Sequence, residues 1–112
     1  MAMLVDSTGT TIIPQLEIAN TFIRRFIGLQ FRSSLPPKSG IWISPCSSIH
    51  TCFMRFPIDV WMLDRNGIVL PSQRNVRPWR IVIAPRGTHS IVETMVDTLS
   101  LTVGQRVEVT HT

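Results

Sequence analysis

The chain of 112 residues has the length of one domain, and 44% of its residues are hydrophobic. That is enough apolar surface to form a core without disulfides or metals, so we predict a single domain over residues 1–112. No run approaches the ~18 to 20 apolar residues of a membrane-spanning helix. The N-terminus lacks the basic region and apolar core of a secretory signal, which predicts a cytoplasmic protein without a membrane span.

The net charge of +4 comes almost entirely from arginine, because Lys38 is the one lysine among 11 basic residues. Arginine suits bidentate recognition of carboxylate or phosphate, so a small anion is the ligand that the composition favours. The arginines are spread along the chain, and Arg24-Arg25 is their tightest cluster. Without a basic stripe interleaved with aromatic residues, the composition argues against nucleic acid.

The first predicted elements are a β-hairpin and a short helix. Residues 4–5 and 10–13 flank a turn that ends in glycine, which is typical of a hairpin. Apolar residues then recur at helical spacing between Asn20, a capping residue, and Gly28, a terminating one. This predicts one short amphipathic helix near residues 20–28. Two consecutive prolines make residues 33–40 a loop before a strand at 41–43.

The second half of the chain is dominated by strand patterns. Asn66-Gly67 is a strong hairpin signal, Pro57 marks a break between strands, and residues 72–79 read as an arginine-bearing loop. Apolar residues in both phases predict strands covered on both sides or a small barrel. The expected fold is therefore mostly β, α+β at the margin, built as a compact twisted sheet or small barrel. Its strands are expected at residues 49–56, 58–63, 68–70, 80–84, 90–93 and 107–109.

The most distinctive stretch runs from Pro45 to Asp64, with the sequence Pro-Cys-Ser-Ser-Ile-His-Thr-Cys-Phe-Met-Arg-Phe-Pro-Ile-Asp-Val-Trp-Met-Leu-Asp. Together with Arg25-Phe26-Ile27-Gly28-Leu29, Pro78-Trp79 and Val92-Glu93, it resembles the DUF192 (UPF0127) family. The resemblance extends from about residue 18 to residue 109. It implies a small β-rich domain with a short helix, from bacteria or archaea and without an established function. Of these two sources we expect a bacterial one.

Cys46, His50 and Cys52 are the residues of this stretch with the greatest chemical potential. Cysteine and histidine are zinc ligands, but no fourth such residue lies nearby in the sequence. A Cys–His nucleophilic pair oriented by Asp59 is the catalytic alternative, although His50 and Cys52 on one strand would lie ~7 Å apart. The interpretation that we favour is structural, with the cysteines acting as small hydrophobic residues. We therefore expect no metal, no cofactor and two unbridged thiols.

Arg55 and Asp59 lie in an otherwise apolar segment, where an unpaired charge would be costly. We expect them to pair with each other or with Glu93. The pair can be structural, or Arg55 can join an arginine of residues 74–80 in facing an anionic ligand. The candidate ligand-binding residues are His50, Arg55, Asp59, Arg77, Trp79 and Glu93.

Two functions from different classes remain open. The first is a binding or interaction module whose partner is a small anionic ligand or another protein. The second is a small-molecule enzyme, hydrolase-like, that uses a pocket around His50, Arg55 and Glu93; no catalytic residue can be assigned. A deep pocket with these residues would favour the enzyme, and a flat exposed apolar patch would favour a protein partner.

Overall fold

A computed structural model describes residues 2–19, 21, 32–52 and 54–111 of the chain. Within these residues the chain forms nine β-strands and no helix, which confirms the mostly β fold. The predicted helix near residues 20–28 lies, apart from Thr21, outside the described residues. The strands are β1 (Ala2–Asp6), β2 (Thr11–Ala19), β3 (Ser39–Ile43), β4 (Ser48–His50), β5 (Ile58–Leu63), β6 (Gln73–Val76), β7 (Ile81–Ile83), β8 (Ser90–Met95) and β9 (Val107–His111).

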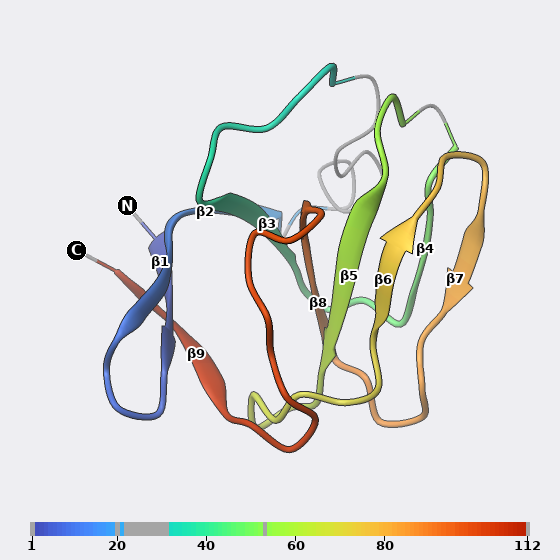
Figure 1. The fold of residues 1–112 in the computed structure, drawn as a ribbon. Helices are drawn as coiled ribbons and strands as arrows, with labels where there is room; N and C mark the ends of the chain where they lie inside the picture. The colour runs from blue at the N-terminus through green and yellow to red at the C-terminus, as the bar shows by residue number, and fades with distance from the viewer. Residues whose placement is uncertain (1, 20, 22–31, 53, 112) are drawn as a thin grey trace.

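Seven strands form one mixed sheet in the order β6-β5-β8-β3-β2-β1-β9, and β4 and β7 form a separate two-stranded sheet (Figure 1). In the large sheet β2 and β3 run parallel, and the other neighbouring strands run antiparallel. β6 and β9 stand at opposite edges, so the sheet is open and the small-barrel alternative is wrong. No helix of the described residues is long and apolar enough to cross a membrane.

The predicted N-terminal hairpin is confirmed: β1 pairs with β2 in antiparallel register around a tight turn. The carboxylate of Asp6 accepts the main-chain N–H groups of Thr8 and Thr10 at 2.9 and 3.0 Å. This arrangement satisfies the donors of the turn locally, as a short side chain at a turn position does. β1 also pairs along its whole length with β9, so the first and last strands of the chain lie side by side.

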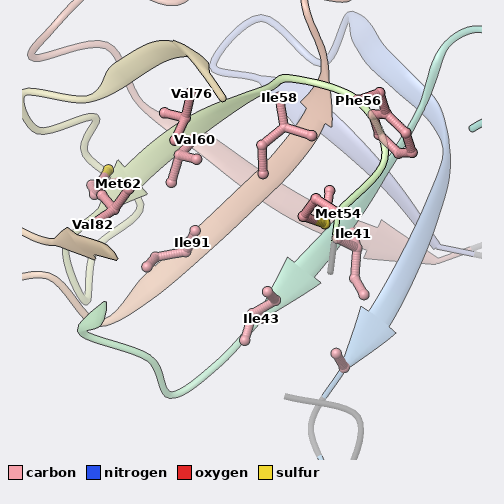
Figure 2. Packing of buried hydrophobic residues seen from close by; sticks show 11 residues of the cluster. Ile41, Ile43, Met54, Phe56, Ile58, Val60, Met62, Val76, Val82 and Ile91 are labelled. Atoms are coloured by element: carbon pink, nitrogen blue, oxygen red, sulfur yellow. The ribbon is translucent and has the colours of Figure 1, made fainter. Parts of the chain in front are cut away.

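The core lies on both faces of the large sheet because its central strands are buried on both sides. All six residues of β5 are buried, and their side chains alternate between two hydrophobic clusters. Ile58, Val60 and Met62 enter the first cluster, shown in Figure 2, whereas Trp61 enters the second. This explains why the segment is apolar in both phases.

The two-stranded sheet belongs to the layer that covers the first cluster. Val82 of β7 is buried in that cluster, and Ile49 of β4 packs against it. Ile49 and Val82 are cross-strand partners, so they define the inner face of the small sheet. The residues on either side of Val82 consequently point outward.

Three predictions of strands and loops differ from the structure. The strand expected at residues 68–70 is reduced to isolated bridges at Ile68 and Val69. The strand expected at residues 49–56 is limited to β4, because the chain leaves the extended form at Thr51. The loop expected at residues 72–79 contains β6, a polar edge strand in which three of four residues are exposed. Such a strand has no apolar alternation from which to recognise it.

Gly67 provides a test of the packing between the turn after β5 and β9. Its φ is +80°, and a Cβ atom there would overlap the carbonyl oxygen of Val107. We expect Gly67→Ala to lower the free energy of unfolding by about 2 to 4 kcal/mol, from backbone strain and steric overlap together. Gly9→Ala is the matched control, since Gly9 has a φ of +84° but no atom within 4 Å of the added Cβ. It should cost only about 1 kcal/mol in urea unfolding, and equal losses would contradict the packing argument.

Candidate functional site

The structure distributes the six predicted site residues over different environments. Asp59 and Glu93 are buried in the large sheet, on the adjacent strands β5 and β8. The others lie near the small sheet or in the segment between β4 and β5. These are His50 in β4, Arg55 between β4 and β5, and Arg77 and Trp79 immediately before β7.

Asp59 is fully buried, and its carboxylate holds two turns in place. Oδ1 accepts the main-chain N–H of Asn75 at 2.8 Å, and Oδ2 accepts that of Asp97 at 3.0 Å. Asn75 and Asp97 both have left-handed backbones, with φ of 54° and 64°. A carboxylate can offset the cost of such conformations by satisfying the N–H groups that they turn inward. The role of Asp59 that these contacts support is structural.

The ionic partner of Asp59 is Arg74, whose Nε lies 3.5 Å from Oδ2. The same guanidinium is 2.8 Å from Asp97 and stacks 5.4 Å from the ring centroid of Trp61. The sequence predicts that Arg55 pairs with Asp59 or with Glu93, and the structure corrects this. Arg55 is exposed and forms no ion pair with another described residue.

Glu93 lies at the centre of the large sheet, where it pairs in register with Ile41 and Val60. Both neighbours belong to the first hydrophobic cluster, and Glu93 is only 3% exposed. Burial raises the pKa of this carboxyl to about 7, although the positive charge of Arg32 opposes the shift. Arg32 itself is bound to Glu17 at 2.8 Å. Glu93 is therefore a proton-binding group near neutral pH within the sheet.

Thr51 is a positioning residue that the sequence analysis did not single out. It is fully buried, and its N–H donates to the carbonyl of Arg80 at 2.8 Å. Its hydroxyl donates to the carbonyl of Arg77 at 2.6 Å and accepts the N–H of Arg80 at 2.8 Å. Its carbonyl accepts the N–H of Trp79 at 3.1 Å. These bonds fix residues 77–80, and a threonine within an apolar run carries no sequence signal of that role.

The segment that Thr51 fixes presents an apolar surface. Trp79 has a φ of 65° and is 61% exposed, and Ile81 and Ile83 are each 77% exposed. A left-handed backbone costs a bulky residue roughly 1 to 2 kcal/mol, and the hydrogen bond to the carbonyl of Thr51 helps to hold Trp79 in this conformation. We call Trp79, Ile81 and Ile83 the β7 patch.

Arginine flanks the β7 patch in the sequence. Arg77, Arg80 and Arg86 are all exposed, and Arg55 is exposed in the segment that follows β4. No aspartate or glutamate occurs in the sequence between Asp64 and Glu93. The patch is therefore an apolar surface with a cationic border, which complements acidic and apolar groups presented together.

Cys46 and Cys52 form no disulfide with each other. Cys46 donates its Sγ–H to the carbonyl of Ser48 at 3.1 Å. His50 pairs with Ile81 across the small sheet. Within the part of the chain that the structure describes, no three His, Cys, Asp or Glu side chains are grouped as a metal ion requires.

Comparison with known proteins gives one family. Residues 3–109 match DUF192, which is described as an uncharacterized ACR. The UPF0127 protein PF1050 of Pyrococcus furiosus is 35% identical over 95% of this chain and 96% of its own length. A UPF0127 protein of Thermococcus sibiricus is 32% identical over 95% of this chain and 73% of its own. These relatives are archaeal, so they do not support the bacterial source that we expected.

A solved structure supports the fold. The crystal structure of a protein of unknown function from Novosphingobium aromaticivorans superimposes with a TM-score of 0.80. It covers 96% of this chain and 82% of that protein, at 20% sequence identity. At this identity the likeness establishes a shared fold and leaves the function to be argued from this chain's own residues.

The structural role of Asp59 predicts a specific ranking of alanine variants. Asp59→Ala leaves two inward-facing N–H groups and Arg74 without their acceptor, so it should lower the free energy of unfolding by about 3 to 5 kcal/mol. Arg74→Ala should cost about 1 kcal/mol, because the Arg74 side chain is 43% exposed and its charge is screened. Urea unfolding measures both. Arg55→Ala is the control and should be nearly neutral; a loss as large as that of Asp59→Ala would contradict the assignment of Arg74 as the partner.

The buried carboxyl of Glu93 predicts a pH-dependent stability. Its pKa is about 7 in the folded chain against 4.5 for an ordinary glutamate, so the folded state retains a proton that the unfolded state releases. The stabilisation from Glu93 is complete below the unfolded value and is lost as the pH rises to the folded one, by roughly 3 kcal/mol in all. Glu93→Gln removes this dependence. Between pH 4.5 and 8 the parent should lose stability relative to the variant, as measured by their free energies of unfolding. A difference that stays constant over this range would contradict the raised pKa of Glu93.

Proposed function

Since this chain belongs to the DUF192 family, whose members are uncharacterised, we propose its function from its own surface: it is a binding module that recognises a protein partner through the β7 patch. The observation that carries the proposal is the exposure of Trp79, Ile81 and Ile83 within five consecutive residues. Clustered apolar side chains on a protein surface are typical of interaction sites. Tryptophan and arginine, both present here, are the residues that contribute most to protein–protein affinity.

The rigidity of the β7 patch supports the same function. Thr51 forms hydrogen bonds with Arg77, Trp79 and Arg80 in the approach to β7, and Val82 anchors the strand in the core. A surface that is already ordered loses little conformational entropy when a partner binds. Trp79 has its left-handed backbone within the segment that these bonds fix. We propose that the module comprises residues 1–112 and acts in the cytoplasm, where thiols such as Cys46 and Cys52 stay reduced.

The hydrolase-like alternative requires a pocket around His50, Arg55 and Glu93. The exposure of Arg55 and the burial of Glu93 beneath its strand neighbours favour the binding module over such a pocket. The cationic border retains one element of the sequence prediction, the preference for negative charge. In this proposal the negative charge is carried by acidic side chains of the partner.

The proposal is tested with a phage-displayed library of random linear peptides selected on the parent protein. Peptides that bind should be enriched in acidic and apolar residues, and the double variant Ile81→Ser, Ile83→Ser should weaken their binding by about tenfold or more. Fluorescence anisotropy with the selected peptides measures the affinities. Unfolding of the double variant should be nearly unchanged, because both side chains are largely exposed.

Val103→Ser is the matched control, since Val103 is 60% exposed and lies outside the β7 patch. It should leave the affinity of the selected peptides unchanged. If selection yields no peptide, or if the patch variant and Val103→Ser affect binding equally, the β7 patch is not the binding surface and the proposal fails.

A further inference from the structure

The outer edge of β7 is open to a further strand. Figure 1 shows β7 at the margin of the molecule, and among the described strands it pairs only with β4. Resting on the proposed function, we infer that the partner binds as an extended, acidic segment that adds a strand to this edge. Strand addition of this kind obtains affinity from main-chain hydrogen bonds and specificity from alternate side chains.

The hydrogen-bond pattern of the small sheet determines which main-chain groups face outward. Thr51 donates its N–H to the carbonyl of Arg80, and Ala84 donates its N–H to the carbonyl of Ser47. Hydrogen-bonded positions recur at every second residue of an antiparallel strand, so Val82, which lies two residues from both Arg80 and Ala84 and pairs with Ile49, directs its N–H and C=O toward β4. The residues between these positions direct their N–H and C=O groups away from the partner strand. Ile81 and Ile83 therefore direct theirs to the open edge, where no described residue bonds to them.

The side chains of the same two residues make the edge unusual. Natural proteins protect open edges with short strands, prolines and charged side chains. β7 is short and is followed by Pro85, but its outward face carries Ile81 and Ile83, each 77% exposed. An added strand would place every second side chain beside these isoleucines. The open main chain and the apolar patch thus favour the same ligand, an extended segment with alternate apolar residues.

The charge of the region selects the partner's chemistry and argues against a second copy of this chain. Arg80 precedes β7 directly and Arg86 follows it closely, and no acidic residue occurs between Asp64 and Glu93. Antiparallel pairing of two β7 strands would bring these arginines near each other, which like charge disfavours. An acidic segment would be attracted by the same groups. With only three residues in β7, we expect binding to be weak and reversible.

The test uses a synthetic peptide of alternating glutamate and valine, with two controls: a block peptide of the same composition, and the analogue in which lysine replaces glutamate. Hydrogen exchange of individual amides, followed by NMR, reports on the edge directly. At saturating alternating peptide the amides of Ile81 and Ile83 should exchange at least about tenfold more slowly. The amide of Val82, which already faces β4, should change little. The block and lysine peptides should give no such protection.

The outcomes separate this inference from the proposed function. If peptides selected through the β7 patch bind but leave the exchange of Ile81 and Ile83 unchanged, strand addition is wrong and the binding module stands. If no peptide depends on the patch and the alternating peptide gives no protection, both are wrong. Protection that grows with protein concentration without peptide would identify a second copy as the occupant and overturn the acidic segment. Equal protection by the lysine analogue would overturn the choice of an acidic ligand.

Discussion

Burial of the central strands on both faces is the constraint on which the rest of the structure depends. Every residue of β5 and five of the six residues of β8 are buried, so each face of the large sheet needs its own covering layer. β4 and β7 contribute to that layer through Ile49 and Val82. A covering strand in a second layer has one face on the core and one in water, which is why β7 displays its isoleucines. The position of the candidate binding surface thus follows from how the core is closed.

Two buried polar residues stabilise the irregular backbone around this core, Asp59 through its side chain and Thr51 through its main-chain carbonyl. Asp59 accepts N–H groups from the left-handed residues Asn75 and Asp97, and the carbonyl of Thr51 accepts the N–H of the left-handed Trp79. In each case a fully buried residue on or beside the core satisfies donors of a neighbouring turn. A buried N–H group that loses its acceptor lowers the free energy of unfolding by its desolvation penalty. Replacing either residue with one that cannot supply the same acceptor therefore destabilises the turn.

Much of the fold could be predicted from sequence, because apolar periodicity and turn residues are local signals. The hairpin of β1 and β2 and the limits of β5 followed from such signals. The polar edge strand β6 gave no apolar pattern and was read as a loop. The helix predicted near residues 20–28 falls on residues that the structure, Thr21 aside, does not describe.

The site was harder to predict because its contacts join distant parts of the chain. The charge of Asp59 indicated that a partner was needed, but register across the sheet decided that the partner is Arg74 and not the nearby Arg55. Thr51 contacts residues that lie 26 and more positions further along the chain, and no spacing rule reveals such a pair. The exposure of Ile81 and Ile83 likewise depends on which face of the small sheet packs against the core. Sequence identified the residue types, and tertiary contacts assigned their roles.

The place of β8 in the strand order has a consequence for how the chain is made. β3 and β5 meet only through β8, which is second to last in sequence but third in the order of the sheet. While the ribosome has not yet released residues 90–95, β1 to β3 and β5 to β6 are two fragments with no shared ladder. Their apolar faces have no complete partner layer during that interval, so the seven-stranded sheet is completed only after β8 has been synthesised.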